Sequence, residues 1–64
     1  MTRNEMIKAY TKAYQNQLSS SAEKRMAELE AEADRQGLRF EMMNRTQYMM
    51  PHYLGAPRFD LVSK

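Results

Sequence analysis

One histidine, a run of alternating acids and a segment rich in tyrosine and arginine are the parts of this sequence that could do chemistry. His52 is the only imidazole and the chain has no cysteine, so a zinc or iron site would lack nitrogen and sulfur ligands within one chain. Alternate positions of a helix point about 200° apart, so acids spaced by two residues do not converge on a metal. This applies to Glu28, Glu30, Glu32 and Asp34. We expect no metal and no cofactor.

The motifs of common enzyme classes are also missing. There is no serine-elbow pattern, and the two glycines, Gly37 and Gly55, do not form a glycine-rich phosphate loop. General acid-base catalysis needs a group with a tuned pKa inside a pocket, which a chain of 64 residues can hardly enclose. We therefore expect a protein that is not an enzyme and has no small-molecule substrate.

The most unusual segment contains no acid from Met42 to Phe59, whereas the middle of the chain is acidic. It is rich in Tyr, Arg and Met, the residue types that protein interfaces favour, and methionine side chains adapt to irregular surfaces. We predict that this segment binds a partner. The predicted contact residues are Arg45, Tyr48, Met49, His52, Tyr53 and Arg58.

Other roles for the same residues stay open. Tyr48 and Tyr53 could stack on bases while the arginines meet phosphates, which would make the chain a nucleic-acid-binding protein. The two tyrosines could instead cover the hydrophobic core, and the methionines could be ordinary core filling in a chain short of leucine and valine. Asn44-Arg45-Thr46 matches a glycosylation acceptor, but no export signal is expected and we draw nothing from it.

The hydrophobic core must be small. Val, Ile, Leu and Phe number nine in total, about 14% of the chain, below the roughly 20% typical of ordered domains. A core this thin leaves a lone chain of this length only marginally stable, so we expect another protein or self-association to support it. The longest apolar run is Tyr48-Met49-Met50, which predicts no membrane span, no export and a place in the cytoplasm or a virion.

Two helices should open the chain. Thr2 and Glu5 have the spacing of a capping box, and apolar residues then recur every three or four positions, which predicts a helix over 3–18. Its buried stripe comprises Met6, Ile7, Ala9, Tyr10, Ala13, Tyr14 and Leu18. Ser20 and Glu23 repeat the capping-box spacing, so a second helix is predicted over 21–36. Its narrow stripe comprises Ala22, Met26, Leu29 and Ala33.

The serines between these helices decide how the helices are arranged. The two stripes would lie roughly 130° apart on one straight helix, so no single partner could cover both. This favours a helical hairpin broken at the serines over one continuous rod, which stays the alternative. Gly37 directly follows the second helix, and we expect it to end this helix in the left-handed conformation, with Leu38 reaching back to Ala33.

Alternating apolar residues predict strands over 38–43 and 58–62, joined by a loop over 44–57. An antiparallel register with Phe40 opposite Phe59 and Leu38 opposite Leu61 would also form two opposite-charge pairs. These are Arg39 with Asp60 and Glu41 with Arg58. A slide by two residues would set Glu41 against Asp60, which disfavours that register. Because a two-stranded ribbon is marginal alone, we expect it to lie on the helical hairpin or to gain a partner's strand.

These patterns together predict one small α+β domain, a two-helix hairpin followed by a two-stranded antiparallel ribbon. The alternative is an all-α chain of two or three helices with an extended C-terminal tail, in which a third helix over 39–50 ends at Pro51. The expected role is a stoichiometric protein-interaction or assembly factor, of the kind found among phage and virus accessory proteins, virion proteins and inhibitors of host enzymes. The alternative role is a nucleic-acid-binding protein, dimeric, that uses the same segment.

Overall fold

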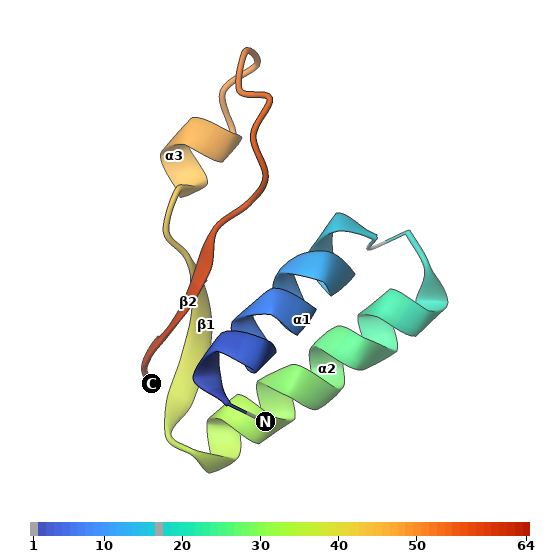
Figure 1. Ribbon diagram of the computed structural model, residues 1–64, viewed down its shortest axis with the longest axis vertical. Coiled ribbons are helices and arrows are strands. Elements are labelled where there is room, and N and C mark those ends of the chain that lie inside the picture. Colours follow the sequence, from blue (N-terminus) through green and yellow to red (C-terminus); the bar gives the residue numbers. More distant parts are fainter. Residues whose placement is uncertain (1, 17) are drawn as a thin grey trace.

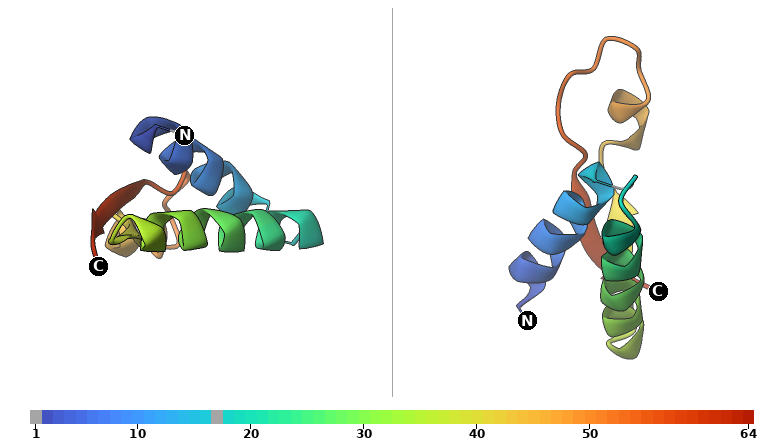
Figure 2. Two further views of the ribbon diagram at one scale, coloured as in Figure 1. Left: turned by 90° about the horizontal axis from the view of Figure 1, so that it is seen from below. Right: turned by 90° about the vertical axis from the view of Figure 1, so that its right-hand side faces the viewer.

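The computed structural model describes residues 2–16 and 18–64. Its elements, in chain order, are α1 (Arg3–Gln15), α2 (Ser20–Arg35), β1 (Leu38–Met42), α3 (Arg45–Tyr48) and β2 (Phe59–Ser63). The α+β prediction is confirmed: the two long helices form a hairpin on one side of a two-stranded antiparallel ribbon (Figures 1 and 2). The segment between the strands, residues 43–58, projects beyond the helices (Figure 1). We call it the arm.

Helix α1 begins as predicted and ends early. The Thr2 hydroxyl accepts from the Glu5 backbone N–H and the Glu5 carboxylate accepts from the Thr2 N–H, so the capping box is confirmed. Asn16 ends the helix and donates its side-chain amide to the Lys12 carbonyl at 3.0 Å. The prediction of a helix to residue 18 is therefore wrong, and Leu18 is fully exposed rather than part of the buried stripe. Gln17 lies outside the described residues.

Helix α2 buries the predicted stripe but lacks the predicted cap. Ala22, Leu29 and Ala33 are buried, while the N-cap is Ser19 and makes no side-chain cap hydrogen bond. The Ser20 capping box is thus wrong, because the Ser19 N–H closes a turn onto the Asn16 carbonyl at 2.9 Å and the helix starts one residue earlier. Within residues 2–16 and 18–64, no helix has both the length and the apolar character needed to cross a membrane.

The core lies where both helices meet the ribbon. Gly37 adopts a φ of +74°, the left-handed conformation predicted for it, and donates its N–H to the Asp34 carbonyl at 3.0 Å. The chain therefore turns directly from α2 into β1. The centre of the core is formed by Met6, Ala33 and Leu61, with Ile7, Leu38 and Phe40 packed around it.

The predicted strand register is wrong by two residues. Phe40 lies opposite Leu61 and Met42 opposite Phe59, so the apolar face is kept, but Glu41 lies opposite Asp60. Each carboxylate has its own cation, which removes the expected repulsion. Arg39 lies 3.5 Å from Glu41, and Arg3 of α1 lies 2.7 Å from Asp60. The Arg3 hydrogen bond, followed by that from the Leu61 N–H, also lowers the pKa of Asp60.

All six aromatic residues of the chain form one continuous series of ring contacts. The Tyr10 ring stacks on Phe40 with centroids 4.0 Å apart and meets Phe59 edge-on at 4.9 Å. Tyr14 continues the series from Phe59, at 5.1 Å, to Tyr48 of α3, at 6.1 Å. Edge-to-face pairs of this kind stabilise a contact beyond the area they bury. They join the arm to the core.

We expect Tyr10 to hold its proton well above the ordinary tyrosine range. Burial, followed by the nearby Glu30 carboxylate, raises the pKa of Tyr10 to about 12. Since the fold favours the neutral phenol, the resulting stabilisation is complete below the ordinary value of 10.0 and is lost as pH rises through about 12. An ultraviolet titration should contain a step near that pH which Tyr10→Phe removes. An identical titration curve for the folded variant would contradict this expectation.

Candidate partner-binding site

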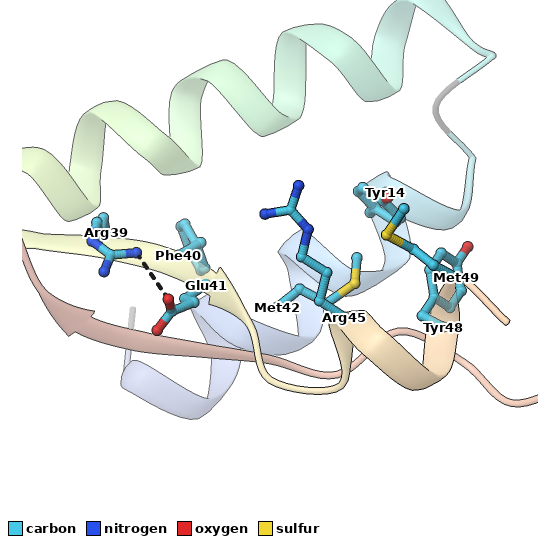
Figure 3. A pocket seen from close by; sticks show the side chains of 8 residues that line it. All are labelled: Tyr14, Arg39, Phe40, Glu41, Met42, Arg45, Tyr48 and Met49. Atoms are coloured by element: carbon cyan, nitrogen blue, oxygen red, sulfur yellow. Dashed lines mark ion pairs between the residues drawn. The ribbon is translucent and has the colours of Figure 1, made fainter.

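A groove of about 650 Å³ lies beside β1, between the end of α1 and the start of the arm. Arg45 extends from the start of α3 into this groove, while Tyr48 and Met49 lie with Tyr14 at one end (Figure 3). We call this the edge groove. It is lined by Tyr14, Arg39, Phe40, Glu41, Met42, Arg45, Tyr48 and Met49.

Asn44 holds the two ends of the arm together. Its side-chain amide donates to the Tyr53 hydroxyl at 2.8 Å and to the Ala56 carbonyl at 3.2 Å, and its Oδ1 accepts from the Arg58 N–H at 2.9 Å. Only 7% of Asn44 is exposed. These bonds cross nine to fourteen residues of chain, so a single side chain sets the shape of a segment with little regular structure.

The tyrosines of the arm are packed rather than free. Tyr48 and Tyr53 are half-buried and meet edge to face with their centroids 6.3 Å apart. Gly55 lies beside them, and a Cβ at that position would displace the Tyr53 ring because it would lie 2.6 Å from the hydroxyl oxygen. The conformation of the arm is therefore fixed by contacts within the arm itself.

Exposed apolar side chains concentrate on the arm. Within residues 2–16 and 18–64, five large apolar side chains are well exposed, and of these only Leu18 lies elsewhere. The other four are Met43, Met49, Met50 and Leu54. Among the described residues Arg45 and Arg58 form no ion pair, and both are exposed. Exposed apolar side chains and exposed arginines therefore lie together on the arm.

The six contact residues predicted from sequence fall into different places. Arg45, Tyr48 and Met49 line the edge groove, and Arg45 and Arg58 line a second hollow of about 480 Å³ on the arm. His52 is exposed on the arm. The Tyr53 hydroxyl is occupied by Asn44.

Sequence reasoning missed two parts of this site. The sequence does not predict the structural role of Asn44, which stands out there only as part of a glycosylation-type tripeptide. Its hydrogen-bonding partners lie far along the chain. The contribution of β1 and Tyr14 to the groove was also missed, since no local pattern shows which side of a ribbon stays open. One usable signal existed: an asparagine next to a predicted strand end is a residue type that bridges turns.

The described residues contain no group of three or more His, Cys, Asp or Glu side chains placed to hold a metal ion. No protein-family model, curated protein or solved structure matches this chain. The charge, exposure and hydrogen bonding of the edge groove and the arm are the features of the molecule that bear on its function.

Proposed function

We propose that this chain is a non-enzymatic protein-binding factor that captures a partner with the edge groove and the arm. The observation that carries the proposal is the gathering of exposed methionine and leucine beside Arg45 and Arg58, which are exposed and form no ion pair in the part of the chain that the structure describes. Because the segment around them has no acid, it complements a partner surface that joins apolar and acidic side chains. The proposal includes the accessory or virion role expected from the size of the chain, and a place in the cytoplasm or a virion.

The packing of the tyrosines favours a protein partner over a nucleic acid. Binding of single strands needs aromatic faces on which bases stack. Tyr48 and Tyr53 are half-buried, and their rings engage each other and Tyr14. The arginines and exposed methionines need no such rearrangement to meet a protein surface.

Reversing the two arginine charges should remove partner binding. The immobilised wild-type chain should capture a partner protein from its source cells. The immobilised double variant Arg45→Glu with Arg58→Glu should capture at least about tenfold less of that protein. The matched control is Lys8→Glu with Lys12→Glu, which makes the same charge change on the exposed side of α1. Capture is quantified for each protein by mass spectrometry.

Two outcomes would overturn the proposal. Equal capture by the arm variant and the wild type would show that the arm is not the contact surface. Binding of oligonucleotides that weakens steeply with salt and depends on both arginines would favour the nucleic-acid alternative. Circular dichroism of each variant verifies that the fold is intact.

A further inference from the structure

The ladder between the strands determines which backbone groups face outward. Lys64 donates its N–H to the Gly37 carbonyl at 3.0 Å, and Met43 donates to the Arg58 carbonyl at 2.7 Å, at the two ends of the ribbon. Hydrogen-bonded pairs alternate along an antiparallel ladder, so Arg39 and Glu41 turn their N–H and C=O groups toward β2. The alternate residues of β1 turn their N–H and C=O groups away from β2, to the outer edge of β1. These are Leu38, Phe40 and Met42.

The outer edge of β2 is closed at its centre. The Leu61 N–H donates to Asp60 Oδ1 at 2.8 Å, and the Leu61 carbonyl accepts from Arg3 Nη2 at 2.8 Å. Arg3 and Asp60 also pair with each other. Both backbone groups that a further strand would need at Leu61 are therefore occupied by side chains, which is one way that natural proteins protect a sheet edge.

The outer edge of β1 has no such protection. Among the described residues, no hydrogen bond uses the outward N–H or C=O groups of Leu38, Phe40 or Met42. Backbone groups of this kind bind water or another strand. The ribbon thus has one edge that is blocked at its centre, at Leu61, and one open edge without such a block.

The edge groove runs along the open edge. Its lining includes the consecutive residues Arg39–Met42 and no residue of β2. Successive side chains of a strand point to opposite faces, so a hollow that touches all of them lies at the edge of the strand. A smaller hollow of about 410 Å³ continues it along the start of β1, where Glu30, Ala31 and Asp34 of α2 form the opposite wall.

We propose that an extended segment of the partner protein adds to β1 as a third, outer strand and places a carboxylate side chain against Arg45. This inference rests on the proposed function and names the chemistry of the partner. Backbone hydrogen bonds to Phe40 and Met42 supply affinity, as in other cases of strand addition. Arg45 lines this groove (Figure 3) and has no ion-pair partner among the residues that the structure describes, which selects an acidic segment. Tyr14 and Met49 provide the apolar wall.

Amide hydrogen exchange of the ¹⁵N-labelled full chain tests the proposal. The probes are three synthetic peptides of about ten residues: alternating valine and threonine with two central glutamates, the same peptide with lysines instead, and the glutamate peptide with alternate backbone nitrogens methylated. The amides of Phe40 and Met42 should exchange quickly in the free chain and at least about tenfold more slowly with the glutamate peptide. The lysine peptide should bind about tenfold more weakly, and the methylated peptide should give no protection.

Several results would overturn strand addition. One is the absence of protection at Phe40 and Met42 with millimolar glutamate peptide. Another is protection that rises with the concentration of the chain alone, which would make a second copy the occupant. A synthetic chain methylated on the Phe40 nitrogen should lose the effect of the peptide. Methylation on the Ser63 nitrogen, at the edge of β2, is the matched control and should preserve it.

The two proposals fail separately. A captured partner that depends on Arg45 and Arg58 but leaves the Phe40 and Met42 amides exchanging would disprove strand addition and leave the proposed function standing. Peptide protection at β1 together with undiminished capture by the arginine double variant would support strand addition and disprove the proposed function.

Discussion

Replacing Leu61 by alanine should remove most of the free energy of unfolding of this chain at room temperature. Leu61 is 2% exposed and packs with Met6 and Ala33 at the junction of both helices and the ribbon. Truncation of a buried leucine costs roughly 3 kcal/mol of the free energy of unfolding. A single core in a domain of this size rarely supplies more than about 3 to 5 kcal/mol, so the loss is comparable to the whole.

The same substitution at Leu54 is the matched control. Leu54 is 97% exposed on the arm, so Leu54→Ala removes the same atoms without opening a cavity. Urea unfolding followed by circular dichroism should give a wild-type midpoint for Leu54→Ala and a midpoint near zero denaturant for Leu61→Ala. Equal midpoints for the two variants would disprove the placement of the core.

Asn44→Ala should release the arm while the rest of the chain stays folded. The substitution removes the part-buried hydrogen bonds to Tyr53, Ala56 and Arg58. The Ala56 carbonyl keeps the Tyr53 hydroxyl as a donor, whereas the Arg58 N–H loses the Asn44 acceptor. A net hydrogen bond of this kind contributes about 1 kcal/mol. Because the bonds lie within the arm, we expect faster amide exchange at Arg58, loss of the contact between Tyr48 and Tyr53, and weaker partner capture.

Thr46→Ala is the control for this prediction, since Thr46 is exposed on the same arm. It should retain wild-type exchange at Arg58 and wild-type capture. If Asn44→Ala kept slow exchange at Arg58, the arm would be held by its aromatic contacts alone.

Local patterns were sufficient to predict the elements of the fold. The periodic apolar stripes indicated both long helices, alternation indicated both strands, and Gly37 marked the turn between them because its left-handed conformation suits glycine. The ends of the elements were predicted less accurately, since α1 stops at Gln15 and the arm contains the single turn α3.

The register and the shape of the arm depend on residues distant in sequence. Arg3 neutralises Asp60 from another element, so a comparison of the two strands alone favoured the wrong pairing. Asn44 acts on residues nine to fourteen positions away, where no periodicity exists. The sequence predicted residues of the candidate site but not the strand edge that the site borders. That edge depends on how the strands pack against α1.

The Arg3 and Asp60 pair on β2 sets a limit on assembly. A ribbon with two open edges could add strands on both sides and grow into a filament. Here the side chains that occupy the backbone of Leu61 terminate the sheet on one side, so each molecule offers a single attachment line. Capture by strand addition would thus end at a stoichiometry of one to one.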